Sequence, residues 1–467
     1  MSKLIRNWGY LLLSDFSQSI ISFFVFMLLA RKLSPEGYGS LNAILALATI
    51  FSIFSINLSS NQVIIREVTL HPKATKDIVR KVILIRAVSL VLTIIALVLY
   101  ILSSGETGTG YITGVSIIVA ATMAWDLAES IAFGHFVTKL TTYISIAAGL
   151  CWFFVIFLLP VNLINVELVI LLYAGIFLIR SIIYLIFSFK RYVIPNEETL
   201  GLNLRSILMM SMPFLWIRIM STFGDQVPIL LLKGQSGNTE VGYYALGSRF
   251  VMPITVAVST GLRAMFPFMT KLFREDRERF NRQLSDGFSM VLLFGSTIAM
   301  LLTVSSHIWI PMLFGEEYLK SILPFNFQSW LGVLLCFDLI VANVLAATYR
   351  QNVLALIMSI DVMIIFPLMY LGSSHGAEGM AVAKLAGTFV TTLYHIVVVM
   401  VVMKANLKSS AFLLSCVYFV VMMCVTIFIY DIVLKVIMIT LFLGLFLIFK
   451  NSPLRTLWRQ ISHRIKT

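Results

Sequence analysis

Residues 82–102 read VILIRAVSLVLTIIALVLYIL, an apolar run whose only charged residue is Arg86. A bilayer core of about 30 Å is crossed by roughly 20 helical residues, because each helical residue advances the chain by about 1.5 Å. The run therefore predicts a membrane-spanning helix. The rest of the chain has the same character, since 59% of its 467 residues are apolar and only 12% are charged. This composition excludes a soluble enzyme, a disordered chain and a nucleic-acid-binding protein.

Thirteen further runs meet the same requirement of length, which predicts an all-α polytopic membrane protein with fourteen transmembrane helices. The predicted spans are Trp8–Ala30, Ser40–Ile65, Val82–Leu102, Tyr111–Phe133, Thr142–Pro160, Val166–Phe187, Ser206–Leu232, Val241–Phe268, Phe288–Ile310, Ile322–Ala347, Val353–Leu371, Gly379–Met403, Phe412–Tyr430 and Ile432–Phe449. Asp431 separates the last two spans with almost no loop. Merging or discarding such segments gives a twelve-span alternative.

The positive charges are distributed unevenly between the two sides of the predicted membrane. The chain has 35 Lys and Arg against 22 Asp and Glu, a net charge of +13. With the N-terminus in the cytoplasm, 24 of the basic residues fall on the inner side, five on the outer side and six within spans. Cytoplasmic loops of membrane proteins are enriched in Lys and Arg. The pattern predicts an even number of spans with both termini cytoplasmic, and the basic excess indicates orientation rather than a nucleic-acid partner.

Two similar stretches indicate an internal repeat. They are PEGYGSL at residues 35–41 and TEVGYYA at residues 239–245, and aligning Gly39 with Gly242 gives an offset of 203 residues. The repeat predicts two six-helix bundles related by pseudo-two-fold symmetry, an arrangement that transporters with alternating access use. The predicted domains are an N-terminal bundle (1–195), a cytoplasmic linker (196–205), a C-terminal bundle (206–405), two additional transmembrane helices (406–450) and a basic cytoplasmic tail (451–467).

Six short motifs occur in order along the two halves. They are ARKLSPEGYG at 30–39, RE at 66–67, VGYYA at 241–245 followed by Arg249, FP at 266–267, LFGEEY at 313–318 and GAEGMA at 376–381. Together they resemble the signatures of the polysaccharide (O-antigen or repeat-unit) flippases, a family of the multidrug/oligosaccharidyl-lipid/polysaccharide (MOP) exporter superfamily. One position departs from the family pattern, since Gly247 stands where the motif has alanine.

The resemblance implies a flippase in the inner (plasma) membrane that moves a polyprenyl-pyrophosphate-linked oligosaccharide to the outer leaflet by alternating access. It also implies polysaccharide polymerase or ligase machinery as partners, beside the lipid bilayer. The sequence has no Walker A motif, HExxH motif or Cys cluster, so we expect no cofactor, no metal and no enzymatic activity. Transport would then draw on a Na⁺ or H⁺ gradient, or on the substrate gradient. The alternatives are a lipid II-type flippase and a cation-coupled multidrug exporter. A membrane-embedded glycan polymerase is disfavoured by the short outer loops.

Basic residues inside the spans are the candidates for substrate binding. Ionisable groups within a membrane are costly and usually face a cavity or a partner. Guanidinium groups bind phosphate oxygens through two parallel hydrogen bonds and stay charged when buried. The predicted pyrophosphate and glycan site consists of Arg86, Arg180, Arg218, Arg249, Arg263 and Lys384. Alternatively, Arg86, Arg180 and Arg263 extend to the headgroups, and Arg249 pairs with Asp225 at the same depth.

Acidic residues inside the spans are the candidates for ion coupling. They are Asp15, Asp126, Glu129, Asp225, Asp338 and Asp361. Asp126 and Glu129 are three residues apart on one helix, close enough to share a cation or a proton. The alternative is that these acids bond to nearby polar groups or to the basic set. His395 is expected to be a hydrogen-bonded residue between helices rather than a proton relay.

Overall fold

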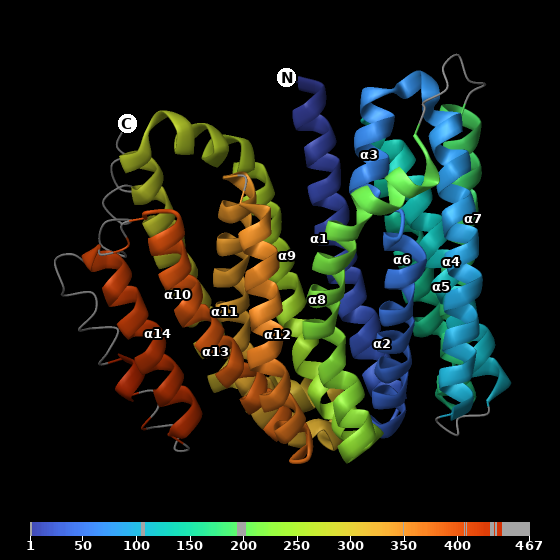
Figure 1. Ribbon diagram of the computed structural model, residues 1–467. Helices are drawn as coiled ribbons and strands as arrows, with labels where there is room; N and C mark the ends of the chain where they lie inside the picture. The colour runs from blue at the N-terminus through green and yellow to red at the C-terminus, as the bar shows by residue number, and fades with distance from the viewer. Residues whose placement is uncertain are drawn as a thin grey trace. The chain divides into compact units, whose positions relative to one another are not determined.

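The computed structural model describes residues 2–103, 108–193, 202–348, 350–405, 407, 409–429, 434 and 437–440. Every regular element within these residues is a helix (Figure 1). The α-helices are α1 (Ser2–Lys32), α2 (Pro35–Asn57), α3 (Asn61–Leu70), α4 (Thr75–Ser103), α5 (Thr109–Gly134), α6 (Lys139–Leu158), α7 (Val166–Tyr192), α8 (Leu204–Ser236), α9 (Asn238–Glu275), α10 (Arg277–Phe314), α11 (Ile322–Ala347), α12 (Gln351–Ser373), α13 (Gly376–Val402) and α14 (Ser410–Phe428). Three short 3₁₀ helices lie at Pro72–Ala74, Val161–Leu163 and Glu316–Ser321.

Thirteen helical segments in the described part of the chain are long and apolar enough to cross a membrane. They coincide with the first thirteen predicted spans, which confirms a polytopic all-α membrane protein. The fourteenth predicted span, Ile432–Phe449, falls almost entirely outside the described residues. Thirteen segments already exceed the number in the twelve-span alternative.

The chain divides into two compact units, Met1–Ala245 and Leu246–Thr467. In unit 1, α5 packs along α7, α1 along α6, and α2 contacts α4, α5 and α8. In unit 2, α11 contacts α10 and α13, α12 packs on α13, and α10 packs on α14. The boundary between the units lies within α9. The predicted linker 196–205 is mostly outside the described residues, so the domain limits drawn from the sequence stay predictions.

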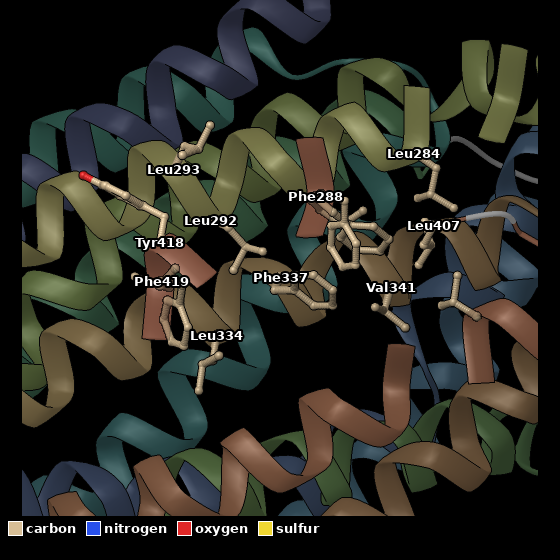
Figure 2. Packing of buried hydrophobic residues seen from close by; sticks show 14 of the residues in the cluster. Leu284, Phe288, Leu292, Leu293, Leu334, Phe337, Val341, Leu407, Tyr418 and Phe419 are labelled. Carbon is tan, nitrogen blue, oxygen red and sulfur yellow. The ribbon is translucent and has the colours of Figure 1, made fainter. Parts of the chain in front are cut away.

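The core of unit 2 forms where α11 is enclosed by its neighbours. The stacked rings of Phe288 on α10 and Phe337 on α11 have centroids 4.2 Å apart (Figure 2). Trp330 on α11 meets the edge of Phe419 on α14, with 5.7 Å between ring centroids. A helix that is apolar on most of its circumference is buried by several partners. This packing fixes the orientation of α11, which carries Asp338.

The second membrane span is interrupted, because α2 ends at Asn57 and α3 begins at Asn61. The sequence predicts one continuous span there, Ser40–Ile65. Ser59, Ser60 and Asn61 have side chains that compete for backbone hydrogen bonds and favour turns and caps over helix interiors. A break within a membrane needs other groups to satisfy the freed backbone.

The first turns of α2 and α9 cross at two glycines of unit 1. A Cβ atom on Gly39 would lie 1.7 Å from the Asn238 carbonyl oxygen, and a Cβ on Gly242 would lie 2.0 Å from the Pro35 carbonyl oxygen. Pro35 and Asn238 are separated by the same 203 residues as the two glycines. The contact is therefore reciprocal, as a two-fold axis produces. It is consistent with the predicted pseudo-symmetry.

Candidate functional site

Arg86 lies at the centre of a buried polar network in unit 1. Its side chain is only 1% exposed. Nε donates to the Ser59 hydroxyl over 3.0 Å, and Nη1 donates to the Met123 carbonyl over 3.1 Å. Nη2 lies 3.2 Å from the Ser59 carbonyl, 3.0 Å from Asn61 Oδ1 and 2.8 Å from Asp126 Oδ2. Arg86 is therefore buried among protein groups and does not reach the lipid headgroups, which excludes that alternative for this residue.

This network closes the break between α2 and α3. The Asn61 amide also donates to Asp126, so the three side chains bond to one another. Arg86 supplies donors to the backbone carbonyl that the break frees at Ser59. The network thus joins two predicted site residues, Arg86 and Asp126, in an ion pair. We expect that pair to position α3, α4 and α5.

Arg180 on α7 has a different environment in the same unit. Its guanidinium lies over the rings of Trp125 and Phe177, 3.8 Å and 4.5 Å from their centroids. Its Nε is buried without a hydrogen-bond partner among the described residues. Stacking on aromatic faces leaves the N–H edge of a guanidinium available to a ligand. Arg180 is therefore a cation held in place by aromatic side chains rather than by a salt bridge.

The aromatic surface continues from Arg180 along α7. Tyr173 packs on Phe177 with 4.0 Å between ring centroids, and Trp152 of α6 meets Tyr173 at 5.4 Å. Positions 173, 177 and 180 follow the helical spacing of one face. The sequence reasoning missed this stripe, although the spacing of aromatic residues before Arg180 could have indicated it.

Asp126 and Glu129 do not share one partner. Asp126 forms the ion pair with Arg86, whereas Glu129 interacts electrostatically with Arg180 and with the more distant Asp15. The Trp125 side chain also contacts Glu129 through a hydrogen bond. Asp126 thus interacts with the guanidinium of Arg86 on α4, and Glu129 interacts with the guanidinium of Arg180 on α7.

Unit 2 contains a second polar cluster, centred on His395 of α13. The Nδ1 atom of His395 lies 2.8 Å from Asp338 Oδ1 on α11, and Nε2 lies 3.0 Å from Asp361 Oδ1 on α12. The Tyr394 hydroxyl donates to the same Asp361 oxygen over 2.7 Å, and the Thr392 hydroxyl donates to Asp338 over 3.2 Å. The His395 side chain is 4% exposed, and the two carboxylates are 22% and 21% exposed.

This cluster unites two predicted acids from separate spans around one histidine. The sequence reasoning placed Asp338 and Asp361 within the membrane but did not connect them. It treated His395 as a hydrogen-bonded residue between helices, which the contacts confirm. A histidine inside an apolar span was the available signal, because an intramembrane ionisable residue is a functional candidate with a partner to be found.

The other predicted residues lie away from these two clusters. Arg218 and Asp225 are exposed on α8 of unit 1, and Asp15 is half-buried on α1. In unit 2, Arg249 on α9 and Lys384 on α13 are half-buried. The backbone of Arg263 lies in α9, but its side chain is outside the described part of the structure. Substrate or ion binding by these residues stays a prediction.

The fold is similar to that of solved multi-pass membrane transporters. A lipid II flippase, MurJ, in an inward closed conformation superimposes with a TM-score of 0.67 at 16% identity, covering 94% of this chain and 98% of that chain. An inward-facing multidrug resistance MATE transporter of the MOP superfamily gives 0.61 at 13% identity, covering 84% and 96%. A point mutant of the Vibrio cholerae MATE transporter VcmN gives 0.58 at 16% identity, covering 87% and 97%.

The family follows from the sequence itself. The family model described as "Polysaccharide biosynthesis protein" matches residues 4–273, which is more than half of the chain. The chain therefore belongs to the polysaccharide biosynthesis protein family. No curated protein matches it.

Proposed function

We propose that this protein is a flippase that moves a polyprenyl-pyrophosphate-linked oligosaccharide repeat unit from the cytoplasmic to the outer leaflet by alternating access. The observation that carries the proposal is Arg180, a cation inside the helices of unit 1 whose buried Nε lacks a partner among the described residues. Membership of the polysaccharide biosynthesis protein family supports the substrate class.

The environment of Arg180 suits a phosphate group. An arginine stays charged when desolvated and offers paired N–H groups to phosphate oxygens. Trp125 and Phe177 hold the guanidinium by its faces, so an anion approaches its edge without displacing a salt bridge. Glu129 nearby limits the positive charge when the site is empty.

The remaining parts of the proposal rest on the charge pattern and on the resemblance to the repeat-unit flippases. Arg218, Arg249, Arg263 and Lys384 are further cationic groups for the pyrophosphate or for acidic sugars. The acids Asp15, Asp126, Glu129, Asp225, Asp338 and Asp361 are the candidates for coupling to an ion gradient. The protein would lie in the inner membrane with both termini in the cytoplasm, act without catalysis, and pass its product to a polysaccharide polymerase or ligase.

A melting experiment tests the proposal. The purified protein is heated alone, with a polyprenyl-pyrophosphate oligosaccharide, and with a panel of lipophilic cations. A ligand at a hundred times its Kd stabilises the folded state by about 2.7 kcal/mol. We expect the pyrophosphate lipid to raise the melting temperature and Arg180→Gln to abolish that rise.

The matched control is Arg191→Gln, which removes an exposed arginine from the same helix. It should keep the rise. A rise with lipophilic cations alone would instead assign the protein to the multidrug exporters. An equal rise in wild type and Arg180→Gln would remove Arg180 from the site. Comparing the oligosaccharide lipid with lipid II separates the repeat-unit flippase from the lipid II-type alternative.

A further inference from the structure

The geometry around His395 sets the number of protons in the unit 2 cluster. Both ring nitrogens face a carboxylate oxygen, at 2.8 Å and 3.0 Å. A neutral imidazole has only one N–H, so it can donate to only one of the two aspartates. The second short contact needs another proton, either on the ring or on a carboxyl group. Asp338, His395 and Asp361 therefore hold at least two protons between them.

The charge of the cluster then depends on one further proton. With two protons the cluster carries a charge of −1, and with three it is neutral. The third proton binds to a carboxylate oxygen that does not already accept from the imidazole, and its release restores the charge. An uncompensated charge inside a membrane is costly, so this proton changes the cost of holding the cluster away from water. The two carboxylates are about one-fifth exposed, whereas the His395 side chain is buried.

In the part of the chain that the structure describes, no fixed positive charge interacts with His395 or Asp338. The charged groups that interact with His395 are Asp338 and Asp361, on the two helices packed against α13. The other polar neighbours are neutral donors, namely the Tyr394 and Thr392 hydroxyls on α13. The Cys336 thiol on α11 is a further titratable group that interacts with Asp338. Asp126 in unit 1 differs, since Arg86 neutralises it permanently.

The cluster also connects helices, so its protonation can bias their packing. It joins α11, α12 and α13 through one imidazole. Release of the third proton leaves the cluster with a net charge of −1, and uptake of that proton makes the cluster neutral. A change of charge at a shared contact is the usual way in which a proton biases a two-state element. Among the described residues, no group of three or more His, Cys, Asp or Glu side chains is arranged to hold a metal ion.

We propose that Asp338, His395 and Asp361 form a proton-binding site, and that binding and release of one proton there couples transport to a proton gradient. The coupling rests on the proposed flippase function, whereas proton binding does not. The proposed ligand is H⁺, because the contacts within the cluster are hydrogen bonds.

Infrared difference spectroscopy tests the binding step on the full chain in lipid nanodiscs, without substrate. Spectra taken at acid and alkaline pH should contain the C=O band of a protonated carboxyl that titrates. The band should shift or vanish in Asp338→Asn and in Asp361→Asn. It should persist in Glu378→Gln, which changes an exposed acid at the start of α13. A band unaffected by both aspartate variants would overturn the proposal.

Vesicle transport tests the coupling step. The probe is a fluorescent polyprenyl-pyrophosphate disaccharide, followed under a pH gradient, a Na⁺ gradient or neither. One pH unit can drive at most about a tenfold ratio of substrate for each proton exchanged, since 1.4 kcal/mol corresponds to tenfold. We expect stimulation by the pH gradient alone. His395→Gln should lose that stimulation, while His375→Gln, at an exposed histidine before α13, should resemble wild type.

The outcomes separate the two proposals. Stimulation by Na⁺, or an unchanged response in His395→Gln, would overturn the proton coupling while leaving the flippase intact. Absence of any flipping would overturn the proposed function, and the infrared bands would still decide whether the cluster binds a proton. If His395→Gln fails to fold, Asp361→Asn replaces it in the vesicles.

Discussion

The crossing of α2 and α9 makes a sharp prediction for Gly39→Ala. In an open helix, exchanging Gly for Ala stabilises the protein by roughly 0.5–1 kcal/mol, because Ala loses less backbone entropy. At Gly39 the new methyl group would lie 1.7 Å from the Asn238 carbonyl oxygen and 2.7 Å from the Gly242 nitrogen. Both atoms are backbone, so no side chain can rotate away. The two helices must separate by more than an ångström to accept it.

The magnitude follows from the cost of overpacking. Forced insertion of a methyl group into a packed interface costs about 1–3 kcal/mol, and occasionally more. That cost outweighs the gain in helix propensity, so the free energy of unfolding should fall. For a domain of about 150–250 residues, each 1 kcal/mol corresponds to about 2–4 °C in Tm. We therefore expect Gly39→Ala to lower the melting temperature by several degrees.

The control lies two residues away on the same helix. A Cβ on Gly37 would meet its nearest atoms at 3.5–3.6 Å, an ordinary contact, so Gly37→Ala should melt at or slightly above the wild-type temperature. The assay is the tryptophan fluorescence of the purified proteins on heating. Gly242→Ala should repeat the loss, and Gly234→Ala, with open space around it, should not. Equal melting of the Gly39 and Gly37 variants would refute the close crossing.

Three further predictions concern other parts of the chain. Asp126→Asn leaves the charge of Arg86 buried without its counter-ion and should lower the free energy of unfolding by about 3–5 kcal/mol; unchanged thermal melting would contradict the ion pair. Burial lowers the pKa of His135, in the loop between α5 and α6, so the unfolded chain binds more protons below the ordinary value of about 6.5 and stability falls on acidification. In His135→Gln the Tm should therefore fall less between neutral and mildly acid pH than in the wild type. An equal fall in both proteins would show that His135 does not cause the loss of stability. Phe337→Ala removes the ring stacked on Phe288 and should cost about 3–5 kcal/mol, measured by denaturant unfolding, against less than about 1 kcal/mol at a lipid-facing position.

The membrane spans were predictable because lipid imposes a simple rule. Backbone groups cannot remain unpaired in the hydrocarbon, so each crossing is a helix whose length the bilayer sets. Thirteen spans were confirmed for this reason. The interruption at residues 58–60 was not predictable from hydropathy. It depends on Arg86, which arrives from another helix to satisfy the Ser59 carbonyl.

The pairing of charges was only partly predictable, because spacing along one helix does not identify the helix opposite. Asp126 and Glu129 were predicted to share a cation or a proton, since three residues nearly complete a turn of 3.6 residues. The remaining angle of about 60° directs Asp126 toward Arg86 and Glu129 toward Arg180. For His395, Asp338 and Asp361 the separation exceeds 20 residues in each case, so only the packing of α11, α12 and α13 unites them.

The two polar clusters show why buried acids in one membrane protein need not share a role. In unit 1, Asp126 faces an arginine, whose charge persists at every pH that the protein tolerates. The ion pair with Arg86 therefore compensates the charge of that carboxylate. In unit 2, Asp338 and Asp361 face a histidine, whose charge itself depends on protons. The negative charges of Asp338 and Asp361 are compensated only when the cluster binds protons, and these protons can also be released. Replacing His395 with arginine should therefore fix the positive charge at this position. Since one positive charge cannot compensate two carboxylates, the carboxyl C=O band should still titrate in the infrared spectrum of this variant.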